Sequence, residues 1–247
     1  MNFSIGLALI SWCFASHGVG QTFRNGGETQ LIEVFTSEGC SSCPPADRWL
    51  YKQGKKPGLF TSFVGIGYHV DYWNDLGWRD PFSHQSFSRR QHLYYKRKRL
   101  QSVATPTVLV DGKPFRGWRQ DKPIPTTKRS PVVLEARKLK THHLEVRFQP
   151  KTLGQTKRFA TACLIGRTLK SKITRGENQG KTLKHDLIGL GCETSQLNQS
   201  KTAFTGRLPL TNLNRIRAPS YAFVVWISQS PKGTPLYVLS GDLGKGK

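Results

Sequence analysis

The sequence predicts two structural units, an α/β unit in the first half of the chain and an antiparallel β-rich unit in the second. Strand-like and helix-like segments alternate within residues 28–119, whereas short segments of alternating apolar and polar residues fill 132–247. Between them, 120–131 contains three prolines and no apolar periodicity, which predicts a linker.

Five elements are predicted in the first unit. They are, in order, strand 29–36, helix 44–54, a largely apolar strand at 59–70, helix 83–100, and a hairpin of 108–110 with 114–118. In the first helix, prolines are tolerated in the first turn and Gly54 ends the helix. Ser83 is a suitable N-cap for the second helix, and Asp111 and Gly112 supply the two-residue turn of the hairpin.

The second unit has the pattern of an antiparallel β-sandwich, because turn residues separate short alternating segments. These segments lie at 132–150, 158–167, 171–177, 201–210, 221–230 and 235–244.

The first twenty residues have the features of a secretory signal peptide. They contain no Lys, Arg, Asp or Glu, and an apolar run from Ile5 to Ala15 precedes a small residue, Gly20, suited to a cleavage site. A membrane anchor needs about 20 apolar residues, more than this run provides. We therefore expect residues 1–20 to be removed, together with Cys13, leaving a periplasmic or secreted protein that is not an integral membrane protein.

The chain carries a formal net charge of +23, of which residues 118–247 contribute +17. The basic residues are scattered among strand patterns and form no recognisable nucleic-acid module, so specific nucleic-acid recognition is not expected. For an exported protein they predict a solvated basic surface that can adhere to anionic envelope polymers.

Cys40 and Cys43 form a CxxC motif between the first strand and the first helix. The positive end of a helix dipole favours thiolate over thiol, and CxxC pairs at helix starts have thiol pKa values of about 3.5 to 7.5. Cys40, expected to be the more exposed, would attack a disulfide, and Cys43 would resolve the mixed disulfide. Zinc sites use the same spacing, so the motif alone does not decide between redox and metal chemistry.

A strand before the CxxC, a helix after it, and a Thr105–Pro106 peptide before a later strand form the arrangement of a thioredoxin fold, in which such a proline is typically cis and faces the dithiol. Alternatively, Pro106 is an ordinary proline at the start of a strand. The segments EVFTSEGCSSCPPAD, YHVDYWNDLGWRDPFS, RQHLYYKRKRLQSVATPTVLVDG and RGENQGKTLKHD resemble the motifs of an exported bacterial thioredoxin-like family known mainly as a domain of unknown function. The resemblance implies a thioredoxin-like N-terminal domain followed by a β-rich part, and it implies no substrate.

His69 and Asp71 follow the central strand and are expected on the same rim as the dithiol. His69 is a candidate proton acceptor, with Asp71 as its orienting partner. The alternative is that both only hydrogen-bond their loop. Arg79 and Asp80 are interpreted as a loop salt bridge.

Cys163 and Cys192 are predicted to form a structural disulfide, because an exported protein meets an oxidising compartment. His185, in the last of the quoted motifs, is interpreted as structural.

The leading functional hypothesis is an extracytoplasmic thiol-disulfide oxidoreductase with Cys40, Cys43, Pro106, His69 and Asp71 at its site. It would act on protein or small-molecule thiols and disulfides, be recycled by an unidentified redox partner, and need no cofactor beyond its own disulfide. Two alternatives stay open. One is binding or delivery of copper or zinc through Cys40, Cys43 and His69. The other is a non-catalytic envelope-binding module in which the CxxC is a fixed disulfide.

Overall fold

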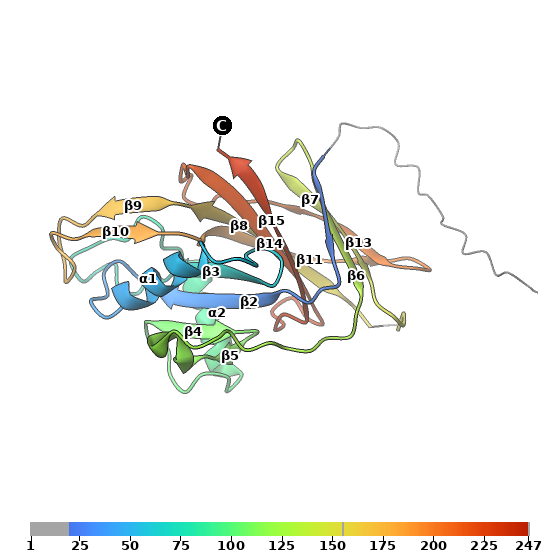
Figure 1. Cartoon of the computed structure of the whole chain (residues 1–247), viewed down its shortest axis with the longest axis horizontal. Coiled ribbons are helices and arrows are strands. Elements are labelled where there is room, and N and C mark those ends of the chain that lie inside the picture. Colours follow the sequence, from blue (N-terminus) through green and yellow to red (C-terminus); the bar gives the residue numbers. More distant parts are fainter. Residues whose placement is uncertain (1–19, 155, 247) are drawn as a thin grey trace, which may run out of the picture.

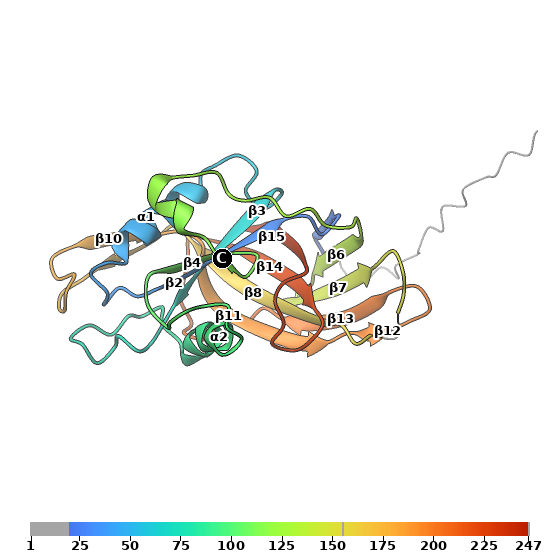
Figure 2. The ribbon, with the colours of Figure 1, turned by 90° about the horizontal axis from the view of Figure 1, so that it is seen from below.

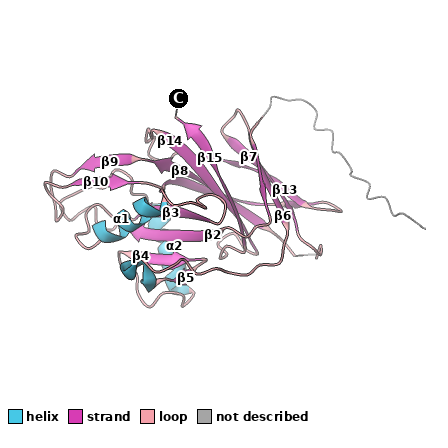
Figure 3. Cartoon of the chain, in the orientation of Figure 1, coloured by secondary structure: helices cyan, strands magenta, loops and turns pink. Residues whose placement is uncertain are grey.

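The structure is a computed structural model and describes residues 20–154 and 156–246. Nearly all of the predicted signal peptide lies outside the described residues. The described part of the chain is mostly β, with 40% of its residues in strands and 12% in helices, and it contains two α-helices. Figure 3 shows strands throughout the molecule and the helices gathered beside β2 (Gln30–Thr36), β3 (Phe63–His69) and β4 (Thr107–Val110). No described helix is long and apolar enough to cross a membrane.

An eight-stranded sheet runs through the molecule and contains strands from both halves of the chain (Figure 1). Its order is β15 (Tyr237–Lys245), β14 (Ser220–Ser228), β8 (Phe159–Arg167), β11 (Ile188–Gln196), β3 (Phe63–His69), β2 (Gln30–Thr36), β4 (Thr107–Val110) and β5 (Lys113–Pro114). β3 is parallel to both β2 and β11, and the other neighbours are antiparallel.

A five-stranded antiparallel sheet packs against β15, β14, β8 and β11 of this large sheet. Its order is β1 (Thr22–Asn25), β6 (Val133–Lys138), β7 (His143–Gln149), β13 (Phe204–Pro209) and β12 (Asn198–Gln199). Apolar side chains of both sheets, among them Phe148, Phe204, Phe223 and Val225, form one core between them. A short hairpin of β9 (Leu169–Lys172) and β10 (Thr182–His185) extends beyond the sheets.

Two helices cover opposite faces of β2 and β3: α1 (Pro44–Gln53) and α2 (Gln85–Lys96) (Figure 2). All seven residues of each of these strands are buried, which explains the largely apolar pattern of β3. α1 begins with two prolines and ends at Gly54 as its C-cap, as the sequence predicts. α2 is shorter than predicted, and its N-cap is His84, whose ring accepts a hydrogen bond from the Ser86 backbone, in place of Ser83.

The prediction of a thioredoxin-like α/β domain followed by a separate β-rich domain is wrong. The reason is that the edge of β3 is occupied by β11, which pairs with it in parallel at Gly67 and Ile188. The core beneath α1 and α2 also contains residues of the second half, including Trp226 and Val224. The first half therefore does not enclose a core of its own.

The predicted linker follows a 3₁₀-helix, η1 (Arg116–Gln120), and has no helix or strand between residues 121 and 132. Arg129 fixes it to the sheet by an ion pair of 2.6 Å with Asp111 and by hydrogen bonds to the carbonyl oxygens of Glu28 and Thr29. The domain boundaries at residues 120 and 131 stay a prediction.

Candidate functional site

Cys40 and Cys43 form a disulfide at the start of α1, with Cys43 as the N-cap. Pro44 and Pro45 occupy the first helical positions and have no N–H groups, so the first helical amide is that of Ala46, which donates to the Cys43 carbonyl at 2.9 Å. The helix dipole thus acts on the sulfurs without direct amide donors from the first two positions. The Ser42 hydroxyl lies 3.4 Å from Cys40 Sγ and donates to it, because a bonded sulfur carries no hydrogen.

Both cysteines are fully buried, each with 0% relative exposure, so the prediction that Cys40 is the more exposed is wrong. Residues 173–181, between β9 and β10, lie over the motif, and we call this segment the cover loop. Asn178, itself fully buried, donates from Nδ2 to the carbonyl oxygens of Glu38 at 2.8 Å and Cys40 at 2.9 Å.

A third hydrogen bond fixes the cover loop to Ser41, one of the two residues between the cysteines. Glu177 Oε2 accepts from the Ser41 backbone N–H at 2.9 Å, and the hydrogen bonds from Ser41 lower the pKa of the exposed Glu177 carboxyl. The cover loop therefore attaches to the chain before, at and after Cys40.

Two glycines allow the cover loop to approach the loop after β3. Gly77 and Gly176 have φ of 95° and 75°, and a Cβ added to Gly77 would lie 3.3 Å from the Gly176 Cα. A Cβ added to Gly176 would lie 3.1 Å from the Trp78 Cβ. Both the left-handed backbone and the small separation favour glycine at these positions.

Beside the cysteines lies a group of ionisable side chains that we call the buried acid–histidine cluster: Glu38, Asp47, His69, Asp80 and His185. Asp80 Oδ2 lies 2.6 Å from His69 Nδ1 and also accepts from the Glu38 backbone N–H at 2.8 Å. Glu38 Oε1 lies 2.9 Å from His185 Nε2, and the two imidazole rings are 5.1 Å apart. Glu38 therefore connects the two histidines, and Cys40 follows it by two residues.

His69 and Asp80 form an ion pair inside the protein. Burial lowers the pKa of His69, but the Asp80 carboxylate more than offsets this and raises the pKa to about 9. Burial likewise opposes ionisation of Asp80, yet the facing imidazolium holds the pKa of that carboxyl below its usual value. Both side chains are charged at neutral pH.

Asp47 is the member of the cluster nearest in sequence to Cys43. Its Oδ1 accepts from the Thr36 hydroxyl at 2.7 Å, whereas its buried Oδ2 has no hydrogen-bond partner among the described residues. Burial raises the pKa of the Asp47 carboxyl, against the opposing effect of His185 and His69. Because Asp47 follows Cys43 by four residues and helical side chains lean toward the N-terminus, its carboxyl points back along the face of α1 that carries Cys43.

The structure places the other predicted site residues differently. Asp71 does not orient His69, because its carboxyl accepts a hydrogen bond from the Ser88 hydroxyl of α2. The partner of His69 is Asp80, for which the sequence predicts a loop salt bridge with Arg79. Pro106 follows a cis peptide bond. The preceding Thr105 accepts a hydrogen bond of 2.8 Å from the Trp73 indole.

The described residues contain no group of three or more His, Cys, Asp or Glu side chains placed to hold a metal ion. Cys40 and Cys43 are bonded to each other, and His69 Nδ1 is engaged by Asp80. The geometry gives no support to a copper or zinc site made of Cys40, Cys43 and His69.

Cys163 and Cys192 form the second disulfide. They lie directly opposite each other on β8 and β11, away from the helix start that carries the first disulfide. Two disulfides in one chain indicate an oxidising, extracytoplasmic environment.

Glu38, Asp47, Asp80, Asn178 and His185 were missed as site residues by the sequence prediction. Asp47 had a local signal, its spacing of four from Cys43 on a predicted helix. Asn178 and His185 belong to the motif RGENQGKTLKHD, which had been noted only for its family resemblance.

Comparison with known proteins identifies the family. A family model described as "Protein of unknown function (DUF1223)" matches residues 31–228. The chain belongs to this family. Among curated proteins, no match was found.

Two solved structures share the fold of this DUF1223 protein. Protein AGR_C_4864 from Agrobacterium tumefaciens has 23% identity and a TM-score of 0.59, with 87% of this chain and 93% of that chain covered. HBP35 of Porphyromonas gingivalis has 12% identity and a TM-score of 0.56, with 87% and 75% covered. At these identities the likeness concerns the fold alone.

Proposed function

We propose that this protein exchanges disulfides and thiols with client molecules through Cys40 and Cys43 in a periplasmic or extracellular compartment. The observation that supports this most directly is the buried Asp47 carboxyl, which has an unpartnered oxygen and lies one helical turn after Cys43. A structural disulfide needs no proton acceptor, whereas a dithiol that reacts must release and regain protons.

The exchange proceeds in two displacements. The Cys40 thiolate attacks one sulfur of a client disulfide, so a Cys40–client bond forms and the client disulfide bond breaks, releasing a client thiolate. Cys43 then passes its proton to Asp47 and attacks Cys40 Sγ, which forms the Cys40–Cys43 bond and releases the second client thiolate. Two electrons move from the dithiol to the client disulfide, and the same steps in reverse oxidise a client dithiol.

Several contacts suit these steps. The Ser42 hydroxyl and the dipole of α1 stabilise negative charge on Cys40. The raised pKa of Asp47 brings it closer to that of a thiol, which makes proton transfer between them easier. The charged His69 offsets part of the cost of ionising Asp47 nearby.

The burial of both sulfurs requires that the cover loop move before a client can react. Within the described residues, the hydrogen bonds between the cover loop and the backbone of Glu38, Cys40 and Ser41 are the two that Asn178 donates and the one that Glu177 accepts from Ser41, and such local opening costs less than global unfolding. The cover loop would thereby limit reaction to clients that can reach the opened motif.

The test is the reduction potential of the Cys40–Cys43 pair, measured by alkylation and mass analysis after equilibration in graded glutathione and dithiothreitol buffers. We expect a potential between about −270 and −120 mV, the range of known exchanging dithiols. The Cys163–Cys192 pair in the same samples serves as the internal reference, expected to stay oxidised. A Cys40–Cys43 pair that is still oxidised below about −300 mV would identify it as a structural disulfide and contradict the proposal.

A further inference from the structure

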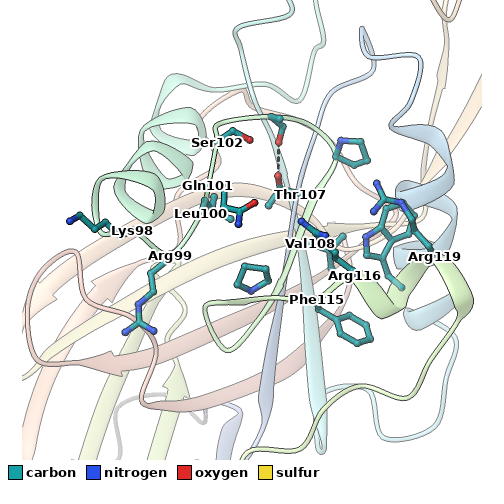
Figure 4. Close-up of a pocket in the computed structure, with 14 residues that line it drawn as sticks. Lys98, Arg99, Leu100, Gln101, Ser102, Thr107, Val108, Phe115, Arg116 and Arg119 are labelled. Atoms are coloured by element: carbon teal, nitrogen blue, oxygen red, sulfur yellow. Dashed lines mark hydrogen bonds between the residues drawn. The ribbon is translucent and has the colours of Figure 1, made fainter.

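A groove of about 740 Å³ lies between the segment after α2 and the hairpin that leads into η1. One wall is formed by residues 98–104 and the other by β4, β5 and η1. Figure 4 shows Lys98 and Arg99 on one side, Arg116 and Arg119 on the other, and Thr107 and Val108 between them.

The groove is positively charged. Lys98, Arg99, Arg116 and Arg119 are exposed, and none of the fourteen lining residues is acidic. Arg119 lies over the Trp118 ring at 4.8 Å, and no described carboxylate lies within ion-pair distance of the four cations. Their charge is therefore directed to solvent and to whatever occupies the groove.

The groove also exposes part of a strand edge. β5 pairs with β4 only at Leu109 and Val110, so β4 has no strand partner on its outer side before Leu109. The backbone groups of Val108 face this open side, where the Phe115 N–H donates to the Val108 carbonyl. An incoming extended chain can form backbone hydrogen bonds with such an edge. Buried apolar side chains of Leu100, Val108 and Trp118 form the floor, against which alternate side chains of that chain can pack.

We propose that the groove binds an acidic polypeptide segment in extended conformation. The four cations select negative charge, the open strand edge selects a peptide backbone, and the apolar floor favours alternation of acidic and apolar residues. A phosphate polymer can pair with the cations, but it has no peptide backbone to bond with the strand edge and no apolar side chains to pack on the floor. Binding does not require the disulfide to react, so this inference stands apart from the proposed exchange chemistry.

The groove nevertheless adjoins the cysteine motif. Pro106 lines it, and Thr105 next to Pro106 accepts a hydrogen bond from Trp73. A Cβ added to Gly39, which precedes Cys40, would lie 3.3 Å from the Trp73 Cβ. Trp73 thus connects the residue before Cys40 with the residue before Pro106.

The test is fluorescence polarisation with the oxidised protein and a short labelled peptide of alternating glutamate and valine. We expect saturable binding that weakens about tenfold in the variant Lys98→Gln, Arg99→Gln, Arg116→Gln. The matched control is Lys170→Gln, Lys172→Gln, Lys184→Gln on the β9–β10 hairpin, which removes the same charge from an exposed surface elsewhere and should change binding less than about twofold.

A second arm uses the same peptide with alternate backbone nitrogens methylated, which keeps its charge and should weaken binding if the strand edge is used. Equal losses in the two triple variants would show nonspecific attraction and overturn the proposal. Unchanged binding of the methylated peptide, or binding of inorganic polyphosphate but not of the peptide, would also overturn it. Circular dichroism of each variant confirms that the fold is retained.

Discussion

Replacement of Asn178 by Ala should make the Cys40–Cys43 disulfide much easier to reduce. Asn178 donates two buried hydrogen bonds, to the carbonyl oxygens of Glu38 and Cys40. A buried hydrogen bond contributes about 1 kcal/mol net, so the closed cover loop loses about 2 kcal/mol relative to the open one. Since 1.4 kcal/mol corresponds to a factor of ten, the open population should rise about 30-fold.

The reduction rate reports this population, because both sulfurs are buried when the cover loop is closed and opening is fast compared with chemical attack. The assay is reduction by a phosphine, quenched by alkylation and read by mass, with Cys163–Cys192 followed in the same sample. Asn212→Ala is the matched control, since Asn212 also makes two side chain to backbone hydrogen bonds, both with Ile216.

A wild-type reduction rate in Asn178→Ala would refute the reasoning, as it would mean that the cover loop does not limit access. Equal acceleration of both disulfides would point to global destabilisation as the cause, and a denaturation curve of each variant separates this from local opening.

Three further predictions follow from the buried groups. The pKa of His69 is raised to about 9 from 6.5, so the stability that its pairing with Asp80 contributes is fully present below pH 6.5 and is lost toward pH 9, by about 3 kcal/mol. Urea unfolding across that range should show the loss, and His69→Gln should remove this part of the pH dependence; an unchanged profile would contradict a charged pair. Asp47→Asn should raise stability above neutral pH, because a buried carboxylate with one unpartnered oxygen is removed, while slowing exchange with a small disulfide about 10²-fold; a variant that exchanges at the wild-type rate would exclude Asp47 as the proton acceptor. Cys163→Ser with Cys192→Ser should lower the free energy of unfolding by about 3 to 4 kcal/mol and leave the potential of the other pair unchanged, and a shifted potential would show that the two disulfides are coupled.

Local sequence patterns predicted the elements around the cysteines, because residues within or next to each element determine where it begins and ends. The prolines after Cys43 and the glycine at 54 set the limits of α1, and Asp111 with Gly112 adopts positive φ in the hairpin turn, as the sequence predicts. The prediction of a thioredoxin-like first domain was wrong because β11, which pairs with the edge of β3, lies more than a hundred residues away in sequence. A local pattern of apolar and polar residues carries no information about such a distant pairing.

The site was only partly predictable for the same reason. The cysteines and His69 were identified from their motif and from a strand end. Asp71 was predicted to be the partner of His69 because the two residues are close in sequence. In the structure the Asp71 carboxyl accepts a hydrogen bond from Ser88 of α2, and Asp80 pairs with the His69 imidazole. The residues that cover the cysteines come from the second half, so their function depends on how the two halves share one sheet.

That arrangement leads to a last prediction, which separates close packing from hydrogen bonding in the cover loop. Gly176→Ala removes no hydrogen-bonding side chain, but its Cβ would lie 3.1 Å from the Trp78 Cβ. Gly180 lies in the same loop with a similar positive φ, 80° against 75°, and a Cβ there would meet nothing within 4 Å. The backbone cost of about 1 kcal/mol is therefore common to both alanine variants, and only Gly176→Ala adds a steric conflict with the loop that packs against it. Reduction of Cys40–Cys43 should be faster in Gly176→Ala than in Gly180→Ala, and equal rates in the two variants would show that contact with Trp78 does not hold the cover loop closed.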